Sequence, residues 1–187
     1  MNSRTVTCPQ YISKIAYISL LWMFQCMYVS IYYNYYILTT SLVGLTCTSL
    51  LFWSDNSNNT VRYIDMIVST TTLGIKSYIA ITDFAILYKY VWFISLSVLV
   101  LSFWMNRTFV EYTIFAKYSN LYINDDRLSY QQYTHHSMME YSPDIIRMYY
   151  ISTYIHMFFT HFLPTVSFSM CVIMTNGGIE SWGEVLL

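Results

Sequence analysis

The chain has 187 residues, of which 10% are charged and 56% are hydrophobic, and its formal net charge is −1. An ordinary soluble domain carries about 25% charged residues, so this chain has too few of them to cover a soluble surface. The balanced net charge also excludes the basic surface of a nucleic-acid-binding protein. We therefore predict an all-α integral membrane protein with the lipid bilayer, and no nucleic acid, among its partners.

The first apolar tract predicts two membrane helices joined by a tight turn. No Lys, Arg, Asp or Glu occurs in the 40 residues from 15 to 54. A spanning helix needs about 20 residues, so the tract is long enough for two. Polar Asn34 stands among four tyrosines at 32–36, and such aromatic residues favour the membrane interface. The predicted helices cover residues 12–32 and 35–53.

The rest of the chain predicts three further helices and one long loop. The apolar segments cover residues 61–83, 90–106 and 148–175, and Pro164 should kink the last of them. Residues 107–146 carry eight charged side chains and are predicted to form an extramembrane loop. The expected architecture is a single membrane domain, 1–187, with five transmembrane helices and a long loop between the fourth and the fifth.

The segment 61–83 is unusual because it holds Arg62, Asp65, Lys76 and Asp83 within an apolar stretch. With 3.6 residues per turn, these four side chains, Ser69 and Thr72 fall in one stripe roughly 80° wide. From Asp65 to Asp83 the stripe rises roughly 27 Å, close to the thickness of the hydrocarbon core. A stripe of this kind favours a face turned towards protein or a polar path.

Each charge in this segment has its own expected role. Arg62 and Asp83 should lie at the two interfaces, and Asp65 should form a structural ion pair with Arg62 at a spacing of three. Lys76 lies three turns inside the helix, where a charge costs about 2.5–3.5 kcal/mol. Three interpretations stay open for Lys76: a buried ion pair, a proton or ion pathway, and a helix whose boundaries are misplaced.

The sequence leaves open whether the backbone stays α-helical near Gly74, two residues before Lys76. A glycine inside a helix costs about 1 kcal/mol relative to alanine unless close packing or a bulge uses it. A π-bulge at this place would rotate everything after it, and such bulges are frequent at functional sites.

Tyr63-Ile64-Asp65-Met66-Ile67-Val68, together with five helices in under 200 residues, resembles chain 6 of NADH–ubiquinone oxidoreductase, a membrane subunit of respiratory complex I. That family's third helix reads Tyr-Ile/Val-Gly-Ala-Ile/Val-Val and carries a π-bulge that couples quinone reduction to proton pumping. The resemblance implies that Tyr63 is the matching residue, with a bulge just beyond it. Here Asp65 and Met66 replace the family's small pair.

The resemblance implies a non-catalytic subunit of the mitochondrial inner membrane, held among other membrane subunits of a hetero-oligomeric complex. The high content of Tyr, Phe and Met agrees with a gene of the AT-rich kind found in mitochondrial genomes. Tyr63, Asp65, Lys76 and Asp83 are the candidates for proton or conformational coupling. Redox centres would lie in other subunits, so no cofactor is expected on this chain alone, although lipids can bind.

Two alternatives to the coupling subunit remain. The chain could be a lineage-specific structural subunit of a respiratory or ATP synthase complex, or a small stand-alone channel or transporter. The pattern Arg62-Tyr63-x-Asp65 is also similar to the third helix of microbial rhodopsins. Retinal binding is nevertheless excluded, because the last predicted helix has no lysine to form a Schiff base.

The histidines predict no metal site. His156 and His161 are five residues apart, so in an α-helix they point about 140° away from each other and cannot bind one metal from one face. His135 and His136 fall in the predicted loop and should be solvated or lie at a subunit contact. The sequence contains no recognisable pair of a nucleophile and a base, so no catalytic residue is assigned.

Overall fold

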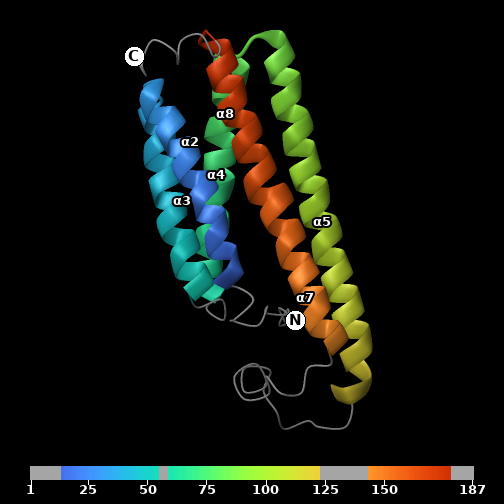
Figure 1. Cartoon of the computed structure of the whole chain (residues 1–187). Coiled ribbons are helices and arrows are strands. Elements are labelled where there is room, and N and C mark those ends of the chain that lie inside the picture. Colours follow the sequence, from blue (N-terminus) through green and yellow to red (C-terminus); the bar gives the residue numbers. More distant parts are fainter. Residues whose placement is uncertain (1–13, 55–58, 123–142, 178–187) are drawn as a thin grey trace.

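The computed structural model describes residues 14–54, 59–122 and 143–177, and these residues form five helical rods (Figure 1). The first rod is the 3₁₀ helix η1 (Lys14–Ser19) followed by α2 (Leu20–Tyr32). The next three are α3 (Tyr36–Ser54), α4 (Asn59–Asp83) and α5 (Ile86–Tyr122). The fifth is continuous through α7 (Pro143–His156), the π-helix η2 (Met157–Phe162) and α8 (Leu163–Thr175). The predicted all-α class is confirmed for these residues.

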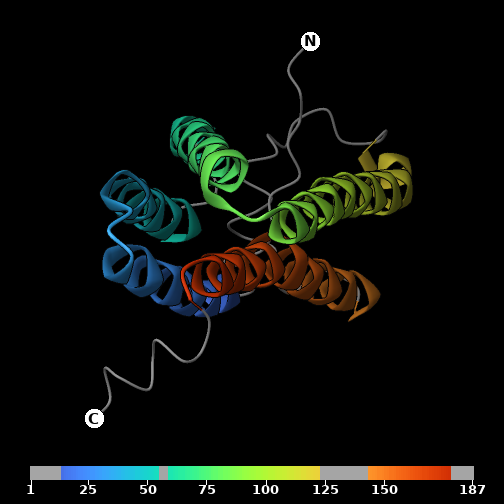
Figure 2. The ribbon, with the colours of Figure 1, turned by 90° about the horizontal axis from the view of Figure 1, so that it is seen from above.

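The rods run up and down and close into a ring. Each rod contacts the next one along the chain, and α8 packs against both α5 and α2. Seen from above, α2 and α8 lie side by side opposite α3, α4 and α5 (Figure 2). This order brings α8 across the bundle from α4, so that side chains of the last helix can meet the inward side of α4.

The turn between α2 and α3 forms at Asn34, as its sequence predicted. Asn34 has a φ of 61°, in the left-handed region that asparagine tolerates better than most residues. The Tyr35 amide donates to the carbonyl of Ser30 at 2.8 Å, which closes the end of α2. The Tyr36 hydroxyl donates to the Asn34 side-chain oxygen at 2.7 Å.

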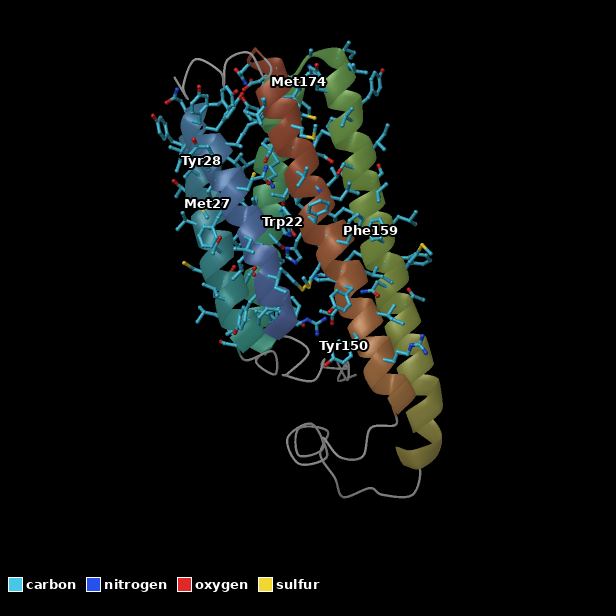
Figure 3. The ribbon with its side chains drawn as sticks, viewed as in Figure 1. Trp22, Met27, Tyr28, Tyr150, Phe159 and Met174 are labelled. Atoms are coloured by element: carbon cyan, nitrogen blue, oxygen red, sulfur yellow. The ribbon has the colours of Figure 1, made fainter. Side chains whose placement is uncertain are left out.

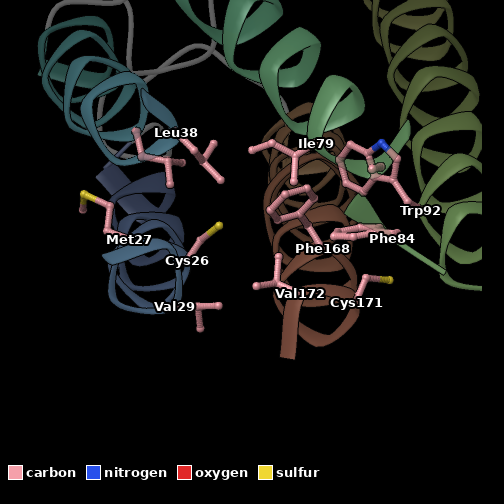
Figure 4. Packing of buried hydrophobic residues seen from close by; sticks show 12 residues of the cluster. Cys26, Met27, Val29, Leu38, Ile79, Phe84, Trp92, Phe168, Cys171 and Val172 are labelled. Carbon is pink, nitrogen blue, oxygen red and sulfur yellow. The ribbon is translucent and has the colours of Figure 1, made fainter. Parts of the chain in front are cut away.

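The apolar core lies towards the end of the bundle where α2 and α8 end. Figure 4 shows how its side chains pack. It joins side chains from all five rods, among them Cys26 of α2, Leu42 of α3, Ile79 of α4, Trp92 of α5 and Phe168 of α8. Aromatic rings meet edge to face here: the Trp92 and Phe168 centroids are 5.2 Å apart at 78°. Such pairs contribute about 0.5–1.5 kcal/mol beyond the area they bury.

Three helices are long and apolar enough to cross a membrane: Tyr36–Ser54, Ile86–Asn106 and Tyr150–Thr175. Ala16–Tyr32 is a shorter apolar helix, and α4 is more polar than these because of its charged stripe. Large apolar side chains point outward from every rod (Figure 3). Examples are Leu21 of α2, Ile37 of α3, Ile67 of α4, Trp104 of α5 and Met170 of α8.

The predicted helix 90–106 is longer than expected. Helix α5 has 37 residues and continues to Tyr122, and α7 begins at Pro143, so helical turns occupy both ends of the predicted loop 107–146. Residues 123–142 of that loop lie outside the described residues. At 1.5 Å per residue α5 is about 55 Å long, well beyond the ~30 Å hydrocarbon core. The Asn106 amide donates to the Ser152 carbonyl at 3.2 Å and ties α5 to the last rod.

The only π-helical residues in the described part of the chain lie in the last rod, not beside Gly74. Helix α4 is α-helical from Asn59 to Asp83, which answers the open question at Gly74 and differs from the bulge beyond Tyr63 that the resemblance implied. The π-helix precedes Pro164, which lacks the backbone N–H of a regular helix and clashes with the carbonyl four residues earlier. A wider turn before the proline relieves that clash.

Candidate functional site

In the first turns of α4, the polar stripe contacts α3 through Asp65. Its Oδ1 accepts hydrogen bonds from Thr48 Oγ1 at 2.9 Å and from Ser49 Oγ at 2.8 Å. Asp65 is partly buried and Ser49 is fully buried. Two hydroxyl donors in one helix turn explain how a carboxylate can lie at an apolar helix contact. Both of these hydrogen bonds come from α3. The ion pair between Asp65 and Arg62 stays a prediction.

The contact between α3 and α4 continues along both helices at intervals of three and four residues. Gly44 of α3 faces Val68, with room for a Cβ atom at 3.8 Å from the valine side chain. The Ser41 and Thr72 hydroxyls are 2.6 Å apart. Small and hydroxyl-bearing residues let membrane helices approach closely and exchange hydrogen bonds. The stripe of α4 is therefore a packing surface as far as Thr72.

Lys76 lies one turn further along α4 and faces the interior of the bundle. Its side chain is only 4% exposed. Its Nζ stands 5.4 Å from the ring centroid of Phe168 on α8, within the range of a cation–π interaction. It also lies near enough to His161 of the last rod to interact with it electrostatically. Lys76 is thus enclosed by this chain's own helices.

No carboxylate in the described part of the chain pairs with Lys76, and none of these residues accepts a hydrogen bond from it. Lys76 lies well inside α4, whose bounds, Asn59–Asp83, are close to the predicted 61–83. A buried cation that no carboxylate pairs with is unfavourable by several kcal/mol unless it is neutralised or reaches water. The buried ion pair and the proton or ion pathway therefore both stay predictions for Lys76.

His156 and His161 come together in the last rod, contrary to the expectation that they point apart. Their Nε2 atoms are 3.2 Å apart, and their rings lie 75° from parallel. The α-helical periodicity behind that expectation does not apply, because the π-helix Met157–Phe162 lies between them and its i→i+5 pattern stacks residues five apart. Sequence reasoning missed this pair.

The remaining predicted site residues lie away from the interior. Tyr63 is 62% exposed on the outer side of α4, so it does not join Lys76. Asp83 is exposed at the end of α4, beside the hydroxyl of Tyr35 in the α2–α3 turn. Tyr35 also hydrogen-bonds Asn176 after α8, and burial raises the pKa of its phenol. These contacts link three chain segments at one end of the bundle.

The described residues therefore separate the four coupling candidates. Lys76 and Asp65 face protein, Asp83 marks an end of the bundle, and Tyr63 faces outward. Within the same described ranges, no three His, Cys, Asp or Glu side chains cluster as metal ligands. Comparison with known proteins found no matching family, no matching characterised protein and no matching solved structure.

Proposed function

We propose that the chain is a non-catalytic integral membrane subunit of a mitochondrial respiratory complex, of the type of chain 6 of complex I. In this proposal all five rods cross the inner membrane and Lys76 takes part in proton or conformational coupling. Redox centres belong to the other subunits.

Membrane insertion of all five rods is supported by length and by the direction of the polar groups. Three helices already meet the length and hydropathy of a spanning segment. Helix α4 has 25 residues, about 37 Å, and turns Thr72 and Lys76 inward while Ile67 and Tyr78 point outward. Helix α2 gains its missing length from η1.

The buried ammonium of Lys76 is the observation that carries the coupling role. Replacing a buried charge with a well-packed apolar residue is often neutral or stabilising, so a purely structural helix has no need of one. Ionisable groups inside membrane segments mark ion and proton paths by default. The Lys76 side chain faces Phe168 and His161 rather than the outside, so its role is internal to this subunit.

A structural subunit is the second candidate, and the regular geometry of α4 favours it. The coupling helix of the chain 6 family depends on a π-bulge, whereas α4 is α-helical throughout. Exposed apolar side chains on every rod also offer broad contact to neighbouring subunits. If the chain is a structural subunit, Lys76 only packs in the interior of the bundle and has no part in coupling.

Purification in mild detergent distinguishes these functions. The tagged full-length chain is extracted from its native membranes, separated by native electrophoresis and identified with its partners by mass spectrometry. Co-migration with NADH dehydrogenase subunits agrees with the proposal, and co-migration with another respiratory complex or ATP synthase supports the structural candidate. A homo-oligomer alone would contradict both and indicate a stand-alone channel or transporter.

A further inference from the structure

The His156–His161 pair lies in the last rod beside Lys76, and the proposed function gives it no role. We propose that the two imidazoles form a proton relay that links Lys76 to the end of the bundle where α3 ends and α4 begins. The inference rests on the proposed coupling role of Lys76 and names the groups through which its proton moves.

The contact between the two rings holds a single proton. Their Nε2 atoms are 3.2 Å apart, a distance that leaves room for one hydrogen between them. One nitrogen therefore donates this proton and the other accepts it. Because donor and acceptor are the same chemical group, the proton can cross the contact without the energetic mismatch of two unlike groups.

The second nitrogen of each imidazole lets a ring take up a proton on one side and release one on the other. Nδ1 of His156 lies 3.4 Å from the Thr160 hydroxyl, which can accept a proton and donate one. His161 interacts electrostatically with His156 on one side and with Lys76 on the other. The pair therefore stands between the buried ammonium and a hydroxyl.

These groups follow one another along the bundle. Lys76 contacts Phe168, and His161 comes seven residues before Phe168 in the last rod, about 10 Å nearer the end where α3 ends. His156 lies further in the same direction, beside Trp53 in the last turn of α3. Helix α4 begins at this end of the bundle (Figure 1), and helical side chains tilt towards the start of their helix. The Lys76 side chain therefore leans towards His161.

The transfer conserves protons and charge. Starting from two neutral rings, the Lys76 ammonium gives a proton through one water molecule to Nδ1 of His161. The proton on Nε2 of His161 moves to Nε2 of His156, and His156 releases its Nδ1 proton to the Thr160 hydroxyl, whose own proton leaves to water. Both rings end neutral, and each returns to its first tautomer by turning over. The reverse order of steps carries a proton inward to Lys76.

Apolar neighbours restrict the path to these groups. Trp53 of α3 and Phe103 of α5 border the His156 ring, with centroids 5.9 and 6.2 Å away. Neither side chain carries a charge, and together they limit access of water from those sides without offering another proton carrier. Histidines inside membrane segments are typical members of proton relays.

Glutamine substitutions separate a relay from a purely structural pair. The glutamine amide reaches the position of Nε2 and can keep a hydrogen bond, but it does not titrate and cannot pass a proton on. In NADH-driven proton translocation by native membrane vesicles, we expect His156→Gln and His161→Gln to assemble and to lower the protons moved per electron by at least half. The matched control, His135→Gln/His136→Gln, changes the chain's other two histidines and should keep the wild-type ratio.

The Lys76→Met variant shows which of the two proposals fails, if one does. Groups in series on one path are not additive, so Lys76→Met/His161→Gln should lower the ratio no further than Lys76→Met alone. A wild-type ratio in either glutamine variant, beside a lowered ratio in Lys76→Met, would overturn the relay and leave the coupling role of Lys76 standing. A wild-type ratio in all three single variants would overturn both.

Nitrogen NMR of the chain itself needs no glutamine variant to fold. In the purified full-length His135→Ala/His136→Ala chain, labelled with ¹⁵N-histidine, His156 and His161 are the only histidines left. The relay predicts that both Nε2 signals lie between the positions of protonated and unprotonated nitrogen, because the proton exchanges between the rings. Two fixed signals, one protonated and one bare, would overturn the relay whichever complex the chain belongs to.

Discussion

Removal of the two hydroxyls that donate hydrogen bonds to Asp65 should loosen the contact between α3 and α4. The change is Thr48→Ala combined with Ser49→Ala, which takes away donors at 2.9 and 2.8 Å. Hydrogen bonds between membrane helices contribute about 0.6 kcal/mol on average and up to about 1.7. Bonds to a carboxylate are stronger than neutral ones, so we expect a loss of about 2 kcal/mol for the pair.

The free energy of unfolding is measured by titrating sodium dodecyl sulfate into mixed micelles and following circular dichroism. Thr40→Ala is the matched control on the same helix, because its exposed hydroxyl bonds only the Tyr36 carbonyl, at 3.0 Å; it should change stability by less than about 0.5 kcal/mol. A double-mutant cycle of Ser49→Ala with Asp65→Ala should show a coupling energy of about 1 kcal/mol. Strict additivity, or a double alanine variant no weaker than the control, would refute the reasoning.

Three further substitutions test other parts of the bundle. Gly74→Ala should stabilise the protein by up to about 1 kcal/mol in the same unfolding assay, because a Cβ there meets open space; a loss would mean that Gly74 is needed for packing or motion. Phe168→Ala should cost about 3–5 kcal/mol, because it removes a 1%-exposed ring beside Trp92; a cost under 1 kcal/mol would contradict its place in the core. The raised pKa of Tyr35 means that the folded state holds the phenolic proton more tightly than the unfolded chain. Stability should therefore be unaffected by this group below about pH 10 and fall as the pH rises above it, and Tyr35→Phe should remove that fall; an unchanged slope would exclude the effect.

Composition and periodicity predicted most of the fold, because apolar tracts of spanning length have few other structures open to them. The α2–α3 turn was predictable from Asn34, which accepts a left-handed backbone. The end of α5 was not, because charges such as Arg107 and Glu111 were interpreted as a loop, whereas a helix leaving the membrane can carry charge and remain helical. The turns of one helix that face lipid and those that face water differ in amino-acid composition, but their backbone conformation is the same.

The interior site was predictable only in part. Helical periodicity placed Asp65 and Lys76 on one stripe, but it could not choose their partners, since Thr48, Ser49 and Phe168 come from other helices. The histidine pair was missed because one π-helical turn changes which residues share a face. A signal did exist: two histidines five residues apart, with Pro164 three residues after the second, where a regular α-helix must adjust.

The coupling role of Lys76 is the central claim, and NADH-driven proton translocation in native membrane vesicles tests it most directly. The Lys76→Met variant replaces the side chain with an unbranched one of similar length and removes its charge, so the core around Phe168 should still pack. We expect the assembled complex to oxidise NADH while the number of protons moved per electron falls by at least half. An unchanged proton-to-electron ratio in a fully assembled complex would contradict the claim.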